Sequence, residues 1–186
     1  MPIQRLLKWM LAAALIVAAG FVTIGLFLPD RLQVQHQIQI KAPPARVFEQ
    51  LAGLTDFDQW SPWGQMDPAM HYQRSGPEQG VGARIQWRSS NPSIGSGSQQ
   101  IEALEAPRWL RMQMSFEGRK SQIQTLYTLT PEAEATRLIW EDQVDFKGDF
   151  IGRYFGLVLR GALGNLQERG LAQLKNVLEG ADLGDN

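Results

Sequence analysis

An uncharged, strongly apolar run near the start of the chain constrains this sequence more than any other feature. From Trp9 to Pro29 there is no ionisable side chain, and leucine, isoleucine, valine, phenylalanine and alanine dominate. A helix of about 20 such residues, rising about 1.5 Å per residue, spans the hydrocarbon core of a bilayer. We therefore predict that residues 1–30 form one transmembrane anchor, with Trp9 at the headgroup level and Pro29 ending the helix.

The charges that flank the apolar run predict its orientation. Arg5 and Lys8 precede the run, whereas Asp30 and Arg31 follow it. The short N-terminal side holds the denser positive charge and is therefore expected to stay in the cytoplasm. The rest of the chain is then exported. The short basic start favours a bacterial inner membrane that is crossed once, with the domain on the periplasmic side.

A cleaved signal peptide is the main alternative for this segment. A basic start, an apolar core and small residues around Ala18, Ala19 and Gly20 are typical of such peptides. However, the apolar run continues to Leu28, which makes it longer than the usual core of roughly 7–15 residues. An uncleaved anchor accounts better for the extra length. A buried helix of a soluble core is less suitable, because the remaining chain is too small to enclose a helix that is apolar on all sides.

The rest of the chain has room for one domain, which we place at residues 31–180, with a polar tail at 181–186. The 186 residues include 18 basic and 19 acidic side chains, and without Arg5 and Lys8 the balance is acidic, which disfavours nucleic acid as a partner. The absence of cysteine excludes disulfides and thiolate ligands. The two histidines, His36 and His71, lie in different segments. We expect no metal and no cofactor.

Alternation of apolar and polar residues predicts a sheet of about seven strands. In the first strand, glutamine occupies every second position from Gln33 to Gln39. The later strands are separated by short turns, which are too short for parallel crossovers, so we expect antiparallel pairing in a meander. The predicted strands are residues 32–40, 70–74, 83–88, 99–104, 110–116, 122–129 and 136–146.

Helical periodicity predicts two short helices after the first strand and one long helix at the end. Apolar residues recur at helical spacing before Gly53, and a second brief turn ends at Ser61-Pro62-Trp63-Gly64. From Asp149 to Gly180 the spacing is helical again, and a curved sheet can wrap around this helix and bury its apolar stripe. The stripe consists of Ile151, Phe155, Val158, Leu159, Leu163, Leu166, Leu171, Leu174 and Leu178.

This order of elements resembles the START-related, birch-allergen-like helix-grip superfamily (SRPBCC), and within it the polyketide cyclase/dehydrase-like lipid-binding branch. The likeness covers about residues 32–179. The segments that carry it are Ile-Lys-Ala-Pro-Pro-Ala-Arg-Val-Phe at 40–48, Trp-Ser-Pro-Trp at 60–63, Gly-Val-Gly at 80–82, Thr-Arg-Leu-Ile-Trp at 136–140 and Gly-Leu-Ala-Gln-Leu-Lys at 170–175. The resemblance implies an α+β helix-grip fold with a deep cavity for lipids or other hydrophobic ligands.

The resemblance leaves three functions open, because this fold serves carriers, enzymes and protein partners. The first is a membrane-anchored domain that binds a hydrophobic small molecule or lipid. The second is a cyclase or dehydratase acting on an apolar substrate, although spacing compels no acid–base couple. The third is a protein-interaction module with a filled core.

Strand parity assigns side chains to the concave face, and the same positions suit a plainly packed core. Trp60 and Trp63 either gate the cavity mouth or pack the short helices, which is the commoner role of tryptophan. Asp142 either faces the interior, where burial requires a partner or a raised pKa, or meets solvent at the strand end. The predicted ligand-binding residues are Trp63, Trp87, Ile101, Met112, Met114, Phe116, Thr125, Tyr127, Trp140, Asp142, Phe155 and Leu159.

Overall fold

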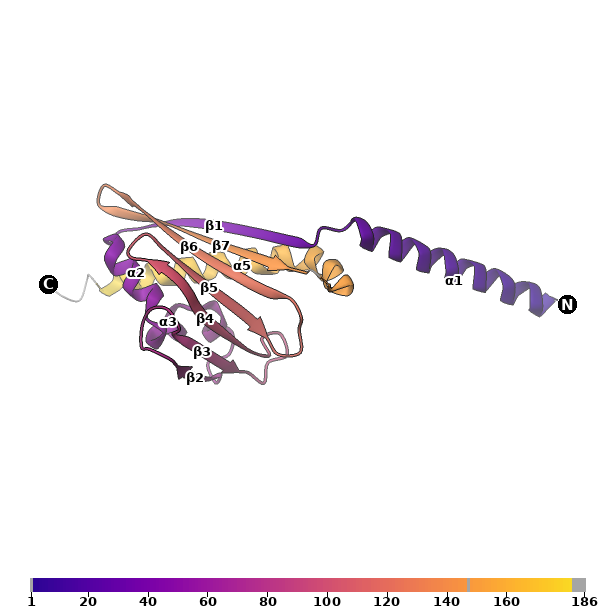
Figure 1. Cartoon of the computed structure of the whole chain (residues 1–186), viewed down its shortest axis with the longest axis horizontal. Coiled ribbons are helices and arrows are strands. Elements are labelled where there is room, and N and C mark those ends of the chain that lie inside the picture. The colour runs from indigo at the N-terminus through magenta and orange to yellow at the C-terminus, as the bar shows by residue number, and fades with distance from the viewer. Residues whose placement is uncertain (1, 147, 182–186) are drawn as a thin grey trace.

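The computed structural model of the chain describes residues 2–146 and 148–181. Helix α1 (Pro2–Phe27) leads into a domain with a seven-stranded antiparallel sheet and a long C-terminal helix, α5 (Phe150–Ala181) (Figure 1). The strands are β1 (Arg31–Ile40), β2 (His71–Ser75), β3 (Arg84–Arg88), β4 (Ser96–Glu105), β5 (Trp109–Phe116), β6 (Gln122–Glu132) and β7 (Ala135–Asp145). Of the predicted polar tail, residues 182–186 lie outside the described residues.

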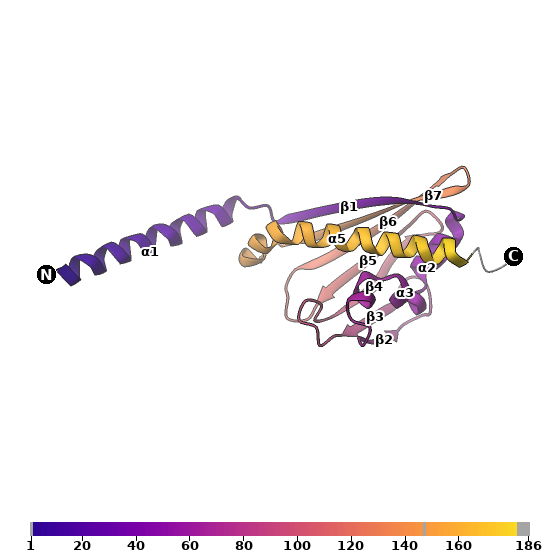
Figure 2. The ribbon, with the colours of Figure 1, turned by 180° about the vertical axis from the view of Figure 1, so that it is seen from behind.

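The sheet has the order β1-β7-β6-β5-β4-β3-β2, so β2 to β7 form the predicted meander. Strand β1 pairs with β7 at the far edge, with Ile38 opposite Leu138. Figure 2 shows α5 lying along one face of the sheet, beside β1. The predicted α+β helix-grip fold is confirmed.

Strand parity predicted the inward faces correctly. In β7 the buried residues alternate with partly exposed ones from Thr136 to Val144. Among the predicted ligand-binding residues that lie on strands, only Phe116 is partly exposed, and the others are buried. Alternation therefore identified the face of the sheet that packs against α5.

The short helices differ from the prediction at one point. Helix α2 (Pro44–Ala52), the 3₁₀ turn η1 (Leu54–Asp56) and helix α3 (Phe57–Trp60) lie where helical spacing placed them. Helix α3 ends before Ser61, as expected, but Ser61 also precedes a further helix, α4 (Pro62–Met66), which was not predicted. The hydroxyl oxygen of Ser61 accepts a hydrogen bond from the backbone N–H of Trp63 at 3.3 Å, and Pro62 occupies the first turn, where it suits a helix start.

Helix α5 buries only part of its predicted apolar stripe. Leu163, Leu171, Leu174 and Leu178 are buried against the sheet and the short helices. The residues of the first turns face outward, with exposed fractions of 53% for Ile151, 57% for Phe155 and 76% for Val158. The prediction of a fully buried stripe was wrong for these turns, because they border an open pocket and not a closely packed layer of side chains.

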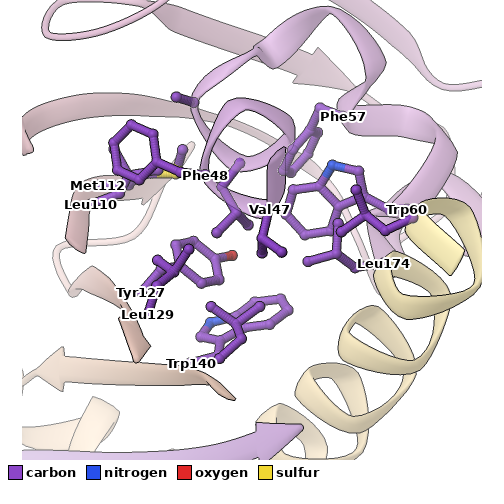
Figure 3. Packing of buried hydrophobic residues seen from close by; sticks show 14 of the residues in the cluster. Val47, Phe48, Phe57, Trp60, Leu110, Met112, Tyr127, Leu129, Trp140 and Leu174 are labelled. Atoms are coloured by element: carbon purple, nitrogen blue, oxygen red, sulfur yellow. The ribbon is translucent and has the colours of Figure 1, made fainter. Parts of the chain in front are cut away.

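The interior between the sheet and α5 has a filled end. Trp60 of α3 inserts there beside Leu174 of α5, and Tyr127 and Trp140 of the sheet lie below it (Figure 3). The ring centroid of Trp60 lies 6.4 Å from that of Tyr127 and 6.3 Å from that of Trp140, both in edge-on geometry. This arrangement suits aromatic rings and leaves this end of the fold packed.

Helix α1 extends away from the domain, and most of its apolar side chains are exposed. Its segment Ile3–Phe27 is a helix of 25 residues that is long and apolar enough to cross a membrane. Membrane anchors and signal sequences share this length and composition.

Candidate ligand-binding pocket

A pocket of about 900 Å³ lies at the end of the domain where α5 begins. It is enclosed by the first turns of α5, the adjoining ends of β6 and β7, helix α4, and the β3–β4 and β5–β6 loops. Small-molecule sites typically hold about 300–1,000 Å³, so the pocket is at the upper end of that range. Its apolar walls are formed by Trp63, Ile94, Phe116, Ile123, Val144, Phe146, Ile151, Phe155, Val158, Leu159, Leu163 and Leu166.

Charged side chains surround these apolar walls. Arg119 and Lys120 of the β5–β6 loop and Arg169 of α5 lie among the lining residues, together with two acidic residues, Glu117 and Asp149. The guanidinium of Arg119 lies 5.8 Å from the centre of the Phe155 ring, so the loop and the helix meet across the pocket. Apolar walls with a few charged groups suit a ligand with an apolar body and a polar or anionic end.

Asp149 has a structural role at this pocket. Its carboxylate accepts a hydrogen bond from the backbone N–H of Gly152 at 2.8 Å and so caps the start of α5. A carboxylate at a helix N-terminus also interacts favourably with the helix dipole. The start of α5, which forms one wall of the pocket, is thereby fixed in place.

The structure divides the predicted ligand-binding residues into two groups. Trp63, Phe116, Phe155 and Leu159 line the pocket. The others are buried but lie outside its lining, and their contact with a ligand stays a prediction. These are Trp87, Ile101, Met112, Met114, Thr125, Tyr127, Trp140 and Asp142.

The two tryptophans occupy different environments, and gating of the pocket by either stays a prediction. Trp60 is 1% exposed and packs in the filled end, as the packing alternative predicted. Trp63 forms part of the pocket wall, with its ring centroid 6.1 Å from that of Phe116. The start of α4 at Ser61 separates the two rings, since Trp60 ends α3 and Trp63 lies on the next helix.

Sequence reasoning missed several residues that line the pocket. Val144 shares the parity of Trp140 and Asp142, so the strand pattern alone would have found it. Ile94 and Arg119 lie in loops, where no periodicity indicates which way a side chain points. Ile151 had been assigned to the buried stripe of α5, and it instead lines the outer part of the pocket.

Asp142 is buried between the sheet and α5, with only 4% of its surface exposed, so it does not meet solvent at the strand end. One carboxylate oxygen accepts hydrogen bonds from the Thr125 hydroxyl at 2.6 Å and from the Trp140 indole N–H at 3.1 Å. The other accepts one from the Gln167 amide at 2.9 Å. Burial raises the pKa of Asp142, and these three hydrogen bonds oppose that rise.

The hydrogen bonds continue from Asp142 toward the surface through α5. The Gln167 amide N–H group also donates to the backbone oxygen of Val34 at 3.2 Å, and the Gln167 amide oxygen lies 2.8 Å from Nδ1 of His36. Nε2 of His36 lies 3.2 Å from a carboxylate oxygen of Glu168. The carboxylate of Asp142 is therefore occupied in joining β6, β7 and α5, and it does not line the pocket.

Tyr127 is a second buried titratable residue on the inner face of the sheet. Burial, together with the nearby charge of Asp142, raises the pKa of Tyr127 well above its ordinary value, so its phenol remains neutral. Within residues 2–146 and 148–181, no histidine lines the pocket and no cluster of metal-ligating side chains occurs. The pocket thus offers apolar surface and a few charges.

Comparison with known families identifies the domain. A protein-family model described as "Polyketide cyclase / dehydrase and lipid transport" matches residues 31–179. The chain belongs to this family. The match begins at the first residue of β1 and ends in the last turn of α5, so it covers the whole domain and excludes α1. No curated protein matches the chain.

Several solved structures share the fold of this domain. Protein MLL2253 from Mesorhizobium loti aligns with a TM-score of 0.59 at 18% identity, over 80% of this chain and 97% of that one. Ara h 8.0201 aligns with a TM-score of 0.55 at 14% identity, over 81% of this chain and 99% of that one. The Aha1 dimer from Colwellia psychrerythraea aligns with a TM-score of 0.55 at 18% identity, over 80% of this chain and 96% of that one. At these identities the likeness shows the helix-grip fold alone.

Proposed function

We propose that this chain is a membrane-anchored member of the family that binds a lipid or another hydrophobic small molecule. Helix α1 acts as an uncleaved anchor in the inner membrane, with its N-terminus cytoplasmic and the domain of residues 31–180 on the periplasmic side. The observation that carries the proposal is the pocket of about 900 Å³ with apolar walls, which lies at the end of the domain where α5 begins.

The charges and shape of the pocket support a lipid with an acidic or polar end. Its walls offer isoleucine, leucine, valine and phenylalanine side chains to an acyl chain, whereas Arg119, Lys120 and Arg169 offer cations to a carboxylate or phosphate. Burying a methylene group from water contributes about 0.8 kcal/mol, so one long acyl chain supplies most of the affinity. Lipid transport is also part of the description of the family that matches this chain.

Photochemical labelling of the full chain tests this proposal. The protein is placed in lipid nanodiscs with a palmitic acid that carries a diazirine in the middle of its chain, and labelled peptides are identified by mass spectrometry after irradiation. We expect labels on the deep pocket walls, at Ile123 and Leu163, because an acyl chain in the pocket reaches both. Labels confined to α1 would show only lipid around the anchor and would contradict the proposal.

A matched pair of variants distinguishes pocket binding from surface contact. Ala162 lies on α5 among the pocket residues, and Ala172 lies exposed on the same helix outside the pocket. We expect Ala162→Trp to lower labelling of Ile123 and Leu163 about tenfold, because an added indole competes with the acyl chain for space in the pocket. Ala172→Trp serves as the control and should leave this labelling unchanged. An equal loss in both variants would point to a general effect on the fold.

A further inference from the structure

The first turns of α5 present an apolar face to the outside of the domain. Ile151, Phe155 and Val158 recur there at helical spacing and also line the open side of the pocket. Leu157, 65% exposed, lies outside the pocket lining. Arg153 is the only charged side chain between residues 150 and 159. A contiguous apolar surface of this kind, beside a pocket mouth, indicates a surface that contacts a membrane or another apolar partner.

The same turns of α5 contact α1. The Phe21 ring of α1 stacks on the Tyr154 ring with centroids 4.4 Å apart and planes at 5°, and it meets the Phe150 ring edge-on at 5.9 Å. The Tyr154 hydroxyl donates to the backbone oxygen of Phe21. Gly25 provides room for this packing, because a side chain there would collide with the Phe150 ring.

Arg153 makes a second link between the two helices. Its guanidinium donates to the backbone oxygen of Gly25 at 3.4 Å. In an α-helix this oxygen would accept from the residue four positions later, which here is Pro29 and has no N–H. A cation at the C-terminal end of a helix is also favoured by the helix dipole. The only charge in the first turns of α5 therefore points to α1, and the apolar face stays uncharged.

The position of the contact along α1 sets the depth of α5 in a bilayer. Phe21 precedes the end of α1 at Phe27 by about 9 Å of helix. The hydrocarbon core is about 30 Å thick, so Phe21 of a membrane-spanning α1 lies within its outer half. Because Phe150 and Tyr154 pack on Phe21, they lie at a similar depth.

We propose that residues 150–158 of α5 lie in the outer leaflet of the bilayer that α1 spans, so that the pocket opens directly to lipid acyl chains. Figure 1 shows that α5 begins at the end of the domain nearest α1. The guanidinium of Arg119 lies over the ring of Phe155. In this arrangement Arg119 and its neighbour Lys120 lie at the level of the lipid phosphate groups. The inference rests on the proposed anchoring by α1 and deepens the proposed function, because it gives the route by which a ligand enters.

The lack of cysteine makes this arrangement directly measurable in the full chain. Single cysteines are introduced at Leu157, outside the pocket lining, at Val17 in the middle of α1, and at Ala172, about 22 Å further along α5 than Leu157. Each carries a nitrobenzoxadiazole fluorophore. The proteins are reconstituted in vesicles of phosphatidylethanolamine and phosphatidylglycerol, and the fluorescence is quenched either by doxyl-labelled phospholipid or by aqueous iodide.

We expect the Leu157 probe to be quenched by the doxyl lipid and to lose most of its iodide quenching, as the Val17 probe does. The Ala172 probe should show the reverse. A Leu157 probe that behaves like the Ala172 probe, while Val17 stays in lipid, would overturn the inference and leave the anchoring intact. Shielding of Leu157 from both quenchers would overturn it in favour of a protein partner. If Val17 itself is open to iodide, the anchoring and the inference fail together.

Discussion

Asp142 is a carboxylate that the fold encloses at an energetic cost, and this cost depends on pH. Its burial holds the folded-state pKa above the ordinary value of 3.8. The unfolded chain keeps the ordinary pKa. At pH values between 3.8 and the higher folded-state pKa, the folded protein therefore binds more protons at Asp142 than the unfolded chain does. The free energy of unfolding therefore falls as the pH rises through that window, with a slope of up to about 1.4 kcal/mol per pH unit.

Substitution of Asp142 by asparagine isolates this contribution. The amide oxygen of Asp142→Asn can still accept from Thr125 and Trp140, but the side chain no longer titrates. We expect the fall in unfolding free energy above pH 3.8 to become shallower in the variant, as measured by urea unfolding of the detergent-solubilised protein across a pH series. An unchanged slope would mean that other groups produce the pH dependence.

At the scale of single residues, the sequence predicted which strand side chains point inward and left open what they contact. Parity placed Asp142 on the inner face, but its partner Gln167 comes from α5, and Gln167 in turn contacts His36 of β1, which is distant in sequence. No local pattern specifies such a pairing. For the same reason, the parity of Met112 and Met114 could not distinguish a pocket wall from a packed core.

At the scale of elements, glycines control how closely α5 approaches the sheet. A side chain at Gly170 would lie 2.7 Å from the Trp140 ring and 3.1 Å from Pro62, closer than packed atoms tolerate, whereas one at Gly161 would meet no other atom within 4 Å. We expect Gly170→Ala to lower the free energy of unfolding by about 1–3 kcal/mol through overpacking. Gly161→Ala should raise it by about 0.5–1 kcal/mol, because alanine suits a helix interior better than glycine does.

Urea unfolding of the two variants in parallel measures both effects. They are matched, since each adds one methyl group to the same helix. A similar response of the two variants would indicate that contact with Trp140 does not limit the approach of α5.

The boundaries of elements were predictable where the pattern was periodic and unpredictable where a single cap determined them. The period-two alternation of apolar and polar residues predicted both β1 and β7 as strands. It did not predict that they pair with each other, because this pairing depends on the course of all the elements between them. Helix α4 was missed because Pro62 was interpreted as a break, although proline is also well suited to the first turn of a helix.

At the scale of the whole molecule, the interior has a filled end and a hollow end along a single helix, and their stabilities should differ. Backbone amides of α5 near Leu171 and Leu174 pack under Trp60, whereas those of residues 154–160 border the pocket. We expect hydrogen exchange of the full chain in nanodiscs without added ligand to be slower around Leu174 than around Leu166, because opening at the hollow end disrupts fewer buried contacts. Leu166 also lines the pocket and lies beyond the turns that we place in lipid. Uniform protection along α5 would contradict this division.

The site itself was the least predictable part of the molecule. The resemblance to helix-grip proteins implied a cavity but did not place it along α5. Its position depends on where Trp60 enters the interior and on two loops, around Ile94 and Arg119, that have no periodicity. Sequence pattern describes one element at a time, whereas an unfilled volume depends on several elements that meet.

The separation of a filled end from a hollow end has a consequence for how the sequence of this protein can evolve. Substitutions near Trp60 and Leu174 alter whether the chain folds, because they affect packing that is complete. Substitutions near Ile123 and Phe155 alter mainly the shape and charge of the space that a ligand would occupy. Selection can therefore modify the shape of the pocket at one end of α5 while the other end preserves the fold.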